Sequence, residues 1–219
     1  MNEKIDTILF DLDGTLINTI DLIVASFEHT LDHYFPETYT RKDIAGFIGP
    51  PLSETFERMN PDYASEMIDK YREFNHAKHD ELVSEYTGVL ETLEQLYDQK
   101  YAMAVVTTKR RDTALKGIQL MNMEKYFPVV ISLDEITKPK PDPEPLQMAL
   151  EQLGKNPHQA IMVGDSEHDI LAGKNTGTLS AGVSWSIKGK SHLQTFEPDV
   201  MLEEMPDLLR FINQTENLR

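Results

Sequence analysis

Two aspartates, Asp11 and Asp13, stand one residue apart directly after the apolar run Ile8–Phe10. Carboxylates this close repel each other, so the arrangement needs a compensating cation or a use for the repulsion. A metal-bound carboxylate can act as a nucleophile, and a second carboxylate outside the metal's coordination can exchange protons. The spacing therefore predicts an acid pair at the end of a strand, with one nucleophilic and one acid–base member.

Further polar residues follow three other apolar runs of the chain, namely Thr107, Thr108, Lys109, Lys138, Lys140, Asp165 and Asp169. Carboxylate oxygens are the ligands that Mg²⁺ prefers, and hydroxyl and ammonium groups can hold phosphoryl oxygens as charge develops on them. These residue types predict phosphoryl transfer in which Asp11 forms an aspartyl-phosphate. Asp13 would protonate the leaving group and then deprotonate water, while Thr107 and a lysine hold the transferred group.

The elements that must position these residues alternate along the chain. Four apolar runs predict strands, at Thr7–Phe10, Ala102–Thr107, Val129–Ser132 and Ala160–Val163. Helical spacing follows in residues 89–97, for which Thr87 is the expected N-cap, and in residues 146–153, which Gly154 is expected to end. Alternating strands and helices predict an α/β fold with a doubly wound, Rossmann-like parallel sheet. In such a sheet ligands bind beyond the carboxyl ends of the strands, so the polar residues should converge there.

Residues 17–84 interrupt this alternation and look helical throughout, with no convincing strand. Helices are expected at Asp21–Phe35, Phe56–Met59 and Tyr63–Phe74. We therefore expect a catalytic core of residues 1–16 and 85–219, with a small helical cap domain inserted after the first strand at residues 17–84. Hinges are expected near residues 15–18 and 81–86, and cap closure would exclude water from the site.

The composition narrows the classes of partner. The 219 residues contain no cysteine, which excludes disulfides and thiolate metal sites and favours a reducing, cytoplasmic compartment. A formal net charge of −16 argues against nucleic acid and anionic membranes as partners. The chain has no apolar run long enough to span a bilayer and no basic-then-apolar leader. We expect a small anionic substrate, which the basic cluster Lys109–Arg111 can bind, and a monomer or homodimer.

Four segments in this order resemble the motifs of the haloacid dehalogenase (HAD) superfamily, namely Asp11–Thr15, Thr107, a lysine before prolines and Gly164–Asp169. The resemblance implies a Mg²⁺-dependent phosphohydrolase with Asp11 and Asp165 as metal ligands. It further implies that Asp13 contributes its backbone carbonyl to the metal and that Asp169 supports the metal site. The true dehalogenases of the superfamily lack the second aspartate of the first motif, so Asp13 favours phosphate chemistry.

Other segments resemble the phosphoglycolate-phosphatase-like branch, and within it the PpaX-type inorganic pyrophosphatases of Gram-positive bacteria; they are Leu16–Thr19, Phe47–Leu52, Thr107–Arg111 and Ala181–Gly189. Most of the branch has aspartate where this chain has Asn18. The resemblance implies pyrophosphate as substrate. Thr108, Lys109, Arg110 and Arg111 would then bind it, and the segment around Gly49 would close over it.

Several alternatives stay open. The Lys-Pro-x-Pro pattern fits twice, and we prefer Lys140 over Lys138 because it runs directly into the next helix. Phosphoglycolate or another small phosphomonoester is the first alternative substrate, and a sugar phosphomutase is the next alternative. A receiver-like phospho-switch uses similar residues but carries no cap. An EF-hand calcium loop is rejected, because Thr15 and Leu16 stand where it needs an oxygen ligand and a glycine.

Overall fold

The computed structural model describes residues 4–217 of the chain. The fold divides into two compact units, one built from the segments up to Ile17 and from Glu85 onwards, the other from Asn18–Ser84. The N-terminal strand and the remainder of the sheet thus belong to one unit although the other is inserted between them in sequence.

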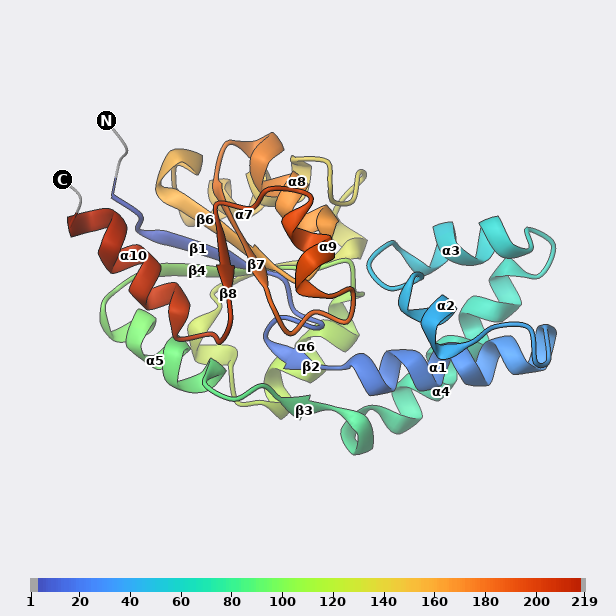
Figure 1. The fold of residues 1–219 in the computed structure, drawn as a ribbon. Coiled ribbons are helices and arrows are strands. Elements are labelled where there is room, and N and C mark those ends of the chain that lie inside the picture. Colours follow the sequence, from blue (N-terminus) through green and yellow to red (C-terminus); the bar gives the residue numbers. More distant parts are fainter. Residues whose placement is uncertain (1–3, 218–219) are drawn as a thin grey trace. The chain divides into compact units, whose positions relative to one another are not determined.

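Within the described residues, the first unit contains a six-stranded sheet in the order β5-β4-β1-β6-β7-β8 (Figure 1). The strands are β1 (Thr7–Phe10), β4 (Ala102–Val106), β5 (Val129–Ile131), β6 (Ala160–Gly164), β7 (Leu179–Val183) and β8 (Val200–Leu202). Every neighbouring pair is parallel. The four strands expected from the sequence are present with ends shifted by one residue at most, and β7 and β8 are additional.

The helices of this unit lie on both faces of the sheet. They are α5 (Val89–Asp98), α6 (Arg111–Leu120), α7 (Glu144–Leu153), α8 (Glu167–Thr176), α9 (Lys190–Gln194) and α10 (Asp207–Asn217), with 3-10 turns η1 (Glu124–Tyr126), η2 (Leu133–Glu135) and η3 (Pro157–Gln159). Figure 1 shows α7 and α8 on one side of the sheet and α5 and α10 on the other. The doubly wound parallel sheet predicted from the sequence is therefore confirmed.

Two helix-end predictions had different outcomes. Gly154 ends α7 in the left-handed conformation, with φ 66°, as expected. Thr87, in contrast, is not the N-cap of α5, because Gly88 occupies that position with φ 83°. A positive φ is favourable for glycine and unfavourable for threonine, which explains why the chain enters α5 one residue later than expected.

The apolar core beneath α7 and α8 fixes the level at which the strands end. Leu9 and Met162 from neighbouring strands pack with Leu146 and Ala149 of α7 and with Ala172 of α8, and all are buried. Each large apolar side chain removed from water contributes about 1.5–3 kcal/mol. The strands therefore pack against a dense layer of side chains. This packing gives the rigidity that a site at their carboxyl ends requires.

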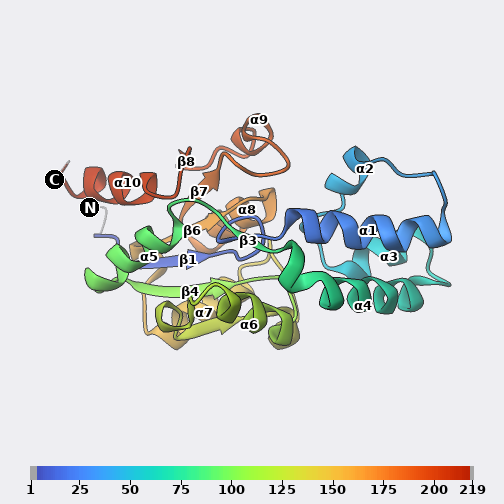
Figure 2. The same ribbon diagram turned by 90° about the horizontal axis from the view of Figure 1, so that it is seen from below.

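The second unit is helical, with α1 (Ile20–Tyr34), α2 (Arg41–Ala45), α3 (Leu52–Met59) and α4 (Ala64–Leu82). Helices α1 and α4 lie side by side (Figure 2). Phe27 of α1 is buried between Phe56 of α3 and Tyr71 of α4, with ring centroids 5.6 and 5.0 Å away. An aromatic cluster of this kind holds three helices together without a sheet.

The expectation of no strand in residues 17–84 was wrong at both ends of the segment. The short strands β2 (Ile17–Asn18) and β3 (Ser84–Glu85) pair to form a separate two-stranded sheet. Two-residue strands are too short for an alternating hydrophobic pattern, so the sequence carries no signal for them. None of the helices in residues 4–217 combines the length and the apolar character that crossing a bilayer requires.

Candidate active site

The register of the sheet brings the sequence motifs to one level. Phe10, the last residue of β1, is aligned with Val105 of β4 and with Val163 of β6. The backbone N–H of Asp11 continues this pairing and donates to the Val163 carbonyl oxygen at 2.9 Å. The chain order also reverses around β1, which places this end of the sheet at a topological switch point. Residues that follow β1, β4 and β6 therefore meet.

Lys140 lies in the loop before α7, and its ammonium group joins two of the motif carboxylates. Its Nζ donates to Oδ1 of Asp11 at 2.7 Å, to Oδ1 of Asp169 at 2.6 Å and to the Val106 carbonyl oxygen at 2.8 Å. Each of the three N–H donors of the ammonium therefore has an acceptor. Lys138, the alternative lysine of the sequence, has a side chain 71% exposed and lies 3.9 Å from Asp142. The Lys-Pro-x-Pro pattern fits both lysines, and of the two it is the preferred Lys140 whose ammonium contacts Asp11 and Asp169.

Three acidic side chains form a buried cluster at this point. One carboxylate oxygen from each of Asp11, Asp165 and Asp169 lies within 4.8 Å of those of the other two. Burial, with the charges of Asp169 and Asp13 adding to it against the opposing Lys140, raises the pKa of Asp11 to about 7. Burial and the charges of Asp11 and Asp169 likewise hold the pKa of Asp165 well above its ordinary value. The surrounding groups therefore do not fully neutralise the negative charge of the cluster. A divalent cation would supply the missing positive charge.

The ammonium of Lys140 stays charged in these surroundings. Its burial lowers the pKa, but the neighbouring carboxylates of Asp11 and Asp169 outweigh that effect and raise the pKa above its ordinary value. A permanently protonated lysine in a shielded position offers a fixed positive charge to an incoming anion.

Asp169 has both carboxylate oxygens engaged. While Oδ1 accepts from Lys140, Oδ2 accepts from the backbone N–H of Ser166 at 3.0 Å and from its hydroxyl at 2.6 Å. The bonds to Ser166 form a capping box at the start of α8. The sequence places Asp169 among the metal residues, and the structure places it beside Lys140 as the group that orients the ammonium.

Two glycines make this close approach possible, and the sequence analysis assigned no role to either. A Cβ on Gly14 would lie 2.4 Å from Oδ2 of Asp165, and Gly14 has φ 84°. A Cβ on Gly164 would lie 2.2 Å from the Cβ of Asp169. Both distances are far below a van der Waals contact. The glycines flank Asp13 and Asp165 in the sequence, and that adjacency is the signal that could have identified them.

The second aspartate of the acid pair faces a different partner. Oδ1 of Asp13 accepts a hydrogen bond from Nζ of Lys109 at 2.8 Å. Thr107 is buried at the end of β4, and its hydroxyl oxygen accepts from the backbone N–H of Lys109 at 3.1 Å. Asp11 and Asp13 are thus each paired with a lysine, one from the loop before α7 and one from the loop after β4.

Of the remaining residues expected to bind substrate, the two arginines have partners outside the acidic cluster. The guanidinium of Arg111 donates to the Val130 carbonyl oxygen at 2.9 Å and pairs with Glu135 at 2.8 Å. Arg110 lies within 4 Å of Asp134 at the start of η2. Thr108 lies between Thr107 and Lys109 and is partly buried, and Gly49 belongs to the helical unit, where φ is 120°. For Thr108, Arg110, Arg111 and Gly49 a role in substrate binding stays a prediction.

A further ion pair adjoins Asp165 and was not anticipated as part of the site. Nζ of Lys188 lies 2.9 Å from both carboxylate oxygens of Glu167, and the charge of Lys188 partly offsets the raised pKa of Asp165. The hydroxyl of Ser186 donates to the Asp165 carbonyl oxygen at 2.6 Å. The loop after β7 therefore supports the turn that carries Asp165. Only the proximity in sequence to Asp165 and Asp169 hints at Glu167.

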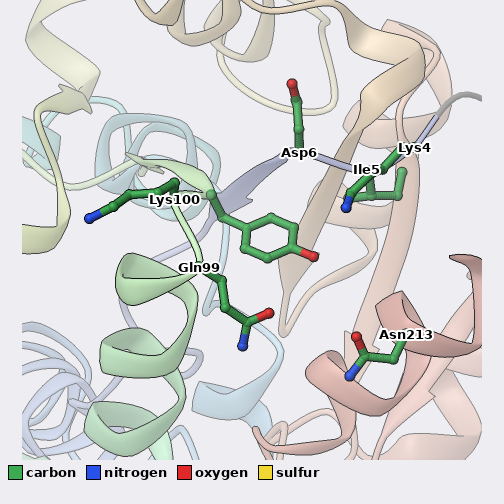
Figure 3. Close-up of a pocket in the computed structure, with 7 residues that line it drawn as sticks. Lys4, Ile5, Asp6, Gln99, Lys100 and Asn213 are labelled. Carbon is green, nitrogen blue, oxygen red and sulfur yellow. The ribbon is translucent and has the colours of Figure 1, made fainter.

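A separate pocket of about 280 Å³ lies at the amino ends of β1 and β4 (Figure 3). Its lining comes from the segment before β1, the segment between α5 and β4, and α10, namely Lys4, Ile5, Asp6, Gln99, Lys100, Tyr101 and Asn213. None of the motif residues contributes to it. This pocket is therefore separate from the acidic cluster at the carboxyl ends of the strands.

Comparison with known proteins agrees with this geometry. Residues 8–183 match the sequence profile of the family described as haloacid dehalogenase-like hydrolase. Pyrophosphatase PpaX of Bacillus pumilus and pyrophosphatase PpaX of Anoxybacillus flavithermus are each 54% identical to the chain, with 97% of this chain and 99% of the relative covered. A haloacid dehalogenase-like family hydrolase of Streptococcus pneumoniae has a TM-score of 0.83 at 27% identity, covering 94% of this chain and 98% of that chain. The profile match and the relatives confirm the resemblance seen in the four motifs: the chain belongs to the haloacid dehalogenase-like hydrolase family.

Proposed function

We propose that this protein hydrolyses inorganic pyrophosphate through an aspartyl-phosphate on Asp11. The observation that carries the proposal is the buried arrangement in which Lys140 joins Asp11 and Asp169 next to Asp165. Such an arrangement suits phosphoryl transfer, where positioning and charge stabilisation supply most of the catalysis. The identity of 54% to two proteins named pyrophosphatase PpaX supports pyrophosphate as the phosphoryl donor.

Mg²⁺ is the cation that we propose for the acidic cluster. The donors are carboxylate oxygens, which hard cations prefer, and the glycine positions at Gly14 and Gly164 leave the room that close carboxylates need. Asp11, Asp165 and the backbone carbonyl of Asp13 would hold the ion, and Asp169 would support it. When bound, the ion neutralises the cluster and polarises a phosphoryl oxygen.

The residues of the chain divide the reaction into two displacements. In the first, an oxygen of Asp11 bonds to the proximal phosphorus, the bond to the bridging oxygen breaks, and Asp13 gives its proton to the departing phosphate. Lys140 and the Thr107 hydroxyl stabilise charge on the transferred group. In the second, water attacks the phosphorus, Asp13 takes the proton, and the bond to Asp11 breaks. The balance is one pyrophosphate and one water converted into two phosphates.

We propose that the unit Asn18–Ser84 acts as a cap domain over this site. Its insertion in the sequence between β1 and β4 supports that role, because movement of the inserted unit need not disturb the sheet. Closure would exclude bulk water during the first displacement. A cytoplasmic location, a small anionic substrate without nucleic acid or membrane partners, and a monomeric or homodimeric state complete the proposal.

The substrate is tested by measuring phosphate release with Mg²⁺ on pyrophosphate and phosphoglycolate in parallel. We expect kcat/KM to be at least ~10-fold higher for pyrophosphate, which corresponds to about 1.4 kcal/mol of transition-state binding. A preference for phosphoglycolate contradicts the substrate and leaves the mechanism in place. Release from neither, together with a stable phosphoprotein, would favour the receiver-like alternative.

The raised pKa of Asp11 predicts how stability depends on pH when no metal is bound. A carboxyl group whose pKa is about 7 when folded and 3.8 when unfolded binds more protons in the folded state. The free energy of unfolding therefore falls as pH rises from about 4 to about 7. His168 has the opposite effect on the free energy of unfolding. Burial lowers the pKa of its imidazole below the ordinary 6.5, so the folded state gains stability as the pH rises through this interval. The metal requires deprotonated ligands, so stabilisation by Mg²⁺ should grow over the same interval.

The measurement is urea unfolding from pH 5 to 8, in EDTA and in Mg²⁺, on the wild type and on Asp11→Asn. The contribution of His168 cancels when the free energy of unfolding of the wild type is subtracted from that of the variant at each pH. In EDTA, the variant should gain stability relative to the wild type as the pH increases. A difference that is constant from pH 5 to 8 would contradict the raised pKa of Asp11.

A further inference from the structure

The loop after β4 holds Lys109 in a defined position. Its backbone N–H donates to the Thr107 hydroxyl at 3.1 Å, and its carbonyl oxygen accepts from the Leu133 N–H at 3.0 Å. The side chain is 12% exposed and the carboxylate that it contacts, Asp13, is 17% exposed. The backbone of Lys109 is held by hydrogen bonds and its ion pair is shielded from water. The side chain is therefore more restricted in position than that of an exposed surface lysine.

The two lysines of the site contact opposite members of the acid pair. Lys140 contacts Asp11, the proposed nucleophile, and therefore lies on the side of the transferred phosphoryl group. Lys109 contacts Asp13 at 2.8 Å, and Asp13 is the group that passes its proton to the leaving oxygen. A cation in hydrogen-bond contact with the general acid lies on the side of the leaving group. This assignment rests on the function proposed above.

Within residues 4–217, Asp13 is the partner of the Lys109 ammonium, so this group has donors left for a ligand. An ammonium group carries three N–H donors, and the bond to Asp13 uses one of them. Lys109 can therefore keep Asp13 and still donate to an oxygen of the leaving group. Neighbouring arginines do not duplicate this position, because Arg111 is bound to Glu135 and the Val130 carbonyl and Arg110 lies beside Asp134.

We infer that Lys109 is a specificity-determining residue that selects phosphoryl donors whose leaving group is itself an anion, such as phosphate. A departing phosphate carries charged oxygens beyond the bridging atom, and Lys109 pairs with them. A departing phenol or other neutral alcohol offers no such oxygen. The charge of Lys109 therefore favours pyrophosphate over a phosphomonoester of a neutral alcohol, with Asp13 contacted in both cases.

The test compares pyrophosphate with phenyl phosphate in the wild type, Lys109→Met and Lys109→Arg. The ratio of the two kcat/KM values is the readout, because effects through the metal or through folding act on both substrates, and the binding measurement below excludes an effect through proton transfer by Asp13. For Lys109→Met the ratio should fall at least ~10-fold, the loss of a hydrogen bond between charged groups. For Lys109→Arg, which keeps the charge, it should stay within about 3-fold of the wild type. An equal loss on both substrates would overturn the inference and make Lys109 a positioning residue for Asp13.

Lys155→Met is the matched control. Lys155 also forms a partly buried ion pair, with Asp6 at 2.7 Å, but near the amino end of β1, far along the strand from the site. Its removal should leave the ratio unchanged. A ratio that falls as much in this control as in Lys109→Met would show a general effect of lost charge and would overturn the inference.

A binding measurement separates this inference from the proposed function. Methylenediphosphonate and methylphosphonate are used as competitive inhibitors of phenyl phosphate hydrolysis. In Lys109→Met the inhibition constant of methylenediphosphonate should rise at least ~10-fold, while that of methylphosphonate stays unchanged. Wild-type protein that fails to cleave pyrophosphate contradicts the proposed function, and this binding result still decides the role of Lys109. Equal changes for both inhibitors would reject it.

Discussion

Replacing Asp11 by asparagine is expected to lower kcat for phosphate release by about 10⁴-fold or more, without loss of the fold. The amide is close in shape to the carboxylate and can still accept from Lys140 through its oxygen. It cannot form an acyl phosphate, so the first displacement has no nucleophile. Because the variant also removes a buried carboxyl group whose pKa is raised, its stability without metal should equal or exceed that of the wild type at pH 8.

The measurement is acid quenching after mixing with labelled pyrophosphate, followed by counting the label on the protein. Asp11→Asn should carry none. Asp13→Asn is the companion variant. It keeps the nucleophile and loses the group that protonates the departing phosphate and activates water, so label should form more slowly and then persist on the protein. Full turnover by Asp11→Asn, or label bound to Asp11→Asn after the acid quench, would reject Asp11 as the nucleophile.

Replacing Lys140 by methionine should combine a large loss of activity with a loss of stability. The substitution leaves the buried carboxylates of Asp11 and Asp169 without their shared cation. Removing one partner of a buried ion pair costs about 3–5 kcal/mol. Losing a charge that stabilises the transition state costs about 10²–10³-fold in kcat. Mg²⁺ should restore part of the free energy of unfolding. It should not restore kcat, because the positive charge at the position of Lys140 is still missing.

Urea unfolding in EDTA and in Mg²⁺, with kcat measured on the same preparations, tests both effects. Lys138→Met is the control, since it belongs to the same proline-rich loop but its side chain is 71% exposed. We expect its free energy of unfolding to change by about 0.5 kcal/mol at most. If Lys138→Met loses as much activity as Lys140→Met, the catalytic lysine is not the one that the geometry indicates.

The parts of the fold that depend on local pattern could be predicted from the sequence. Thr7–Phe10 is a run of buried residues followed by polar ones, and its limits agree with those of β1. Gly154 has the residue type that a left-handed helix end needs, and it ends α7. The strands β7 and β8 were not predicted because Leu179–Val183 and Val200–Leu202 each contain a single β-branched residue, a valine at one end, so the strand signal is weak.

The candidate site divides in the same way. Asp11 and Asp165 could be chosen because each directly follows a strand, and Asp13 because it stands two residues after Asp11. The choice between Lys138 and Lys140 depends on which ammonium reaches Val106 and Asp11, and that is decided by the path of a loop rather than by a pattern.

Arg110 and Arg111 show a second limit of sequence analysis. As a basic cluster after β4 they predict an anion site, but the acidic residues of η2, which follow a different strand, pair with them. A charge cluster in sequence does not reveal its counter-charges in space. Lys109 alone of the three basic residues contacts a catalytic candidate within the part of the chain that the structure describes.

The pairing of β1 has a consequence for biosynthesis. Thr7 is aligned with Ala102 on one side and with Ala160 on the other, so the earliest strand to be made is flanked by strands made much later. Non-local pairing of this kind slows folding, because the intervening chain must be ordered first. Asp165 and Asp169 complete the acidic cluster only when the last of these strands and the start of α8 have been synthesised. A growing chain on the ribosome therefore contains its proposed nucleophile long before the two aspartates that complete the cluster, and it can use that nucleophile only when β6 has paired with β1.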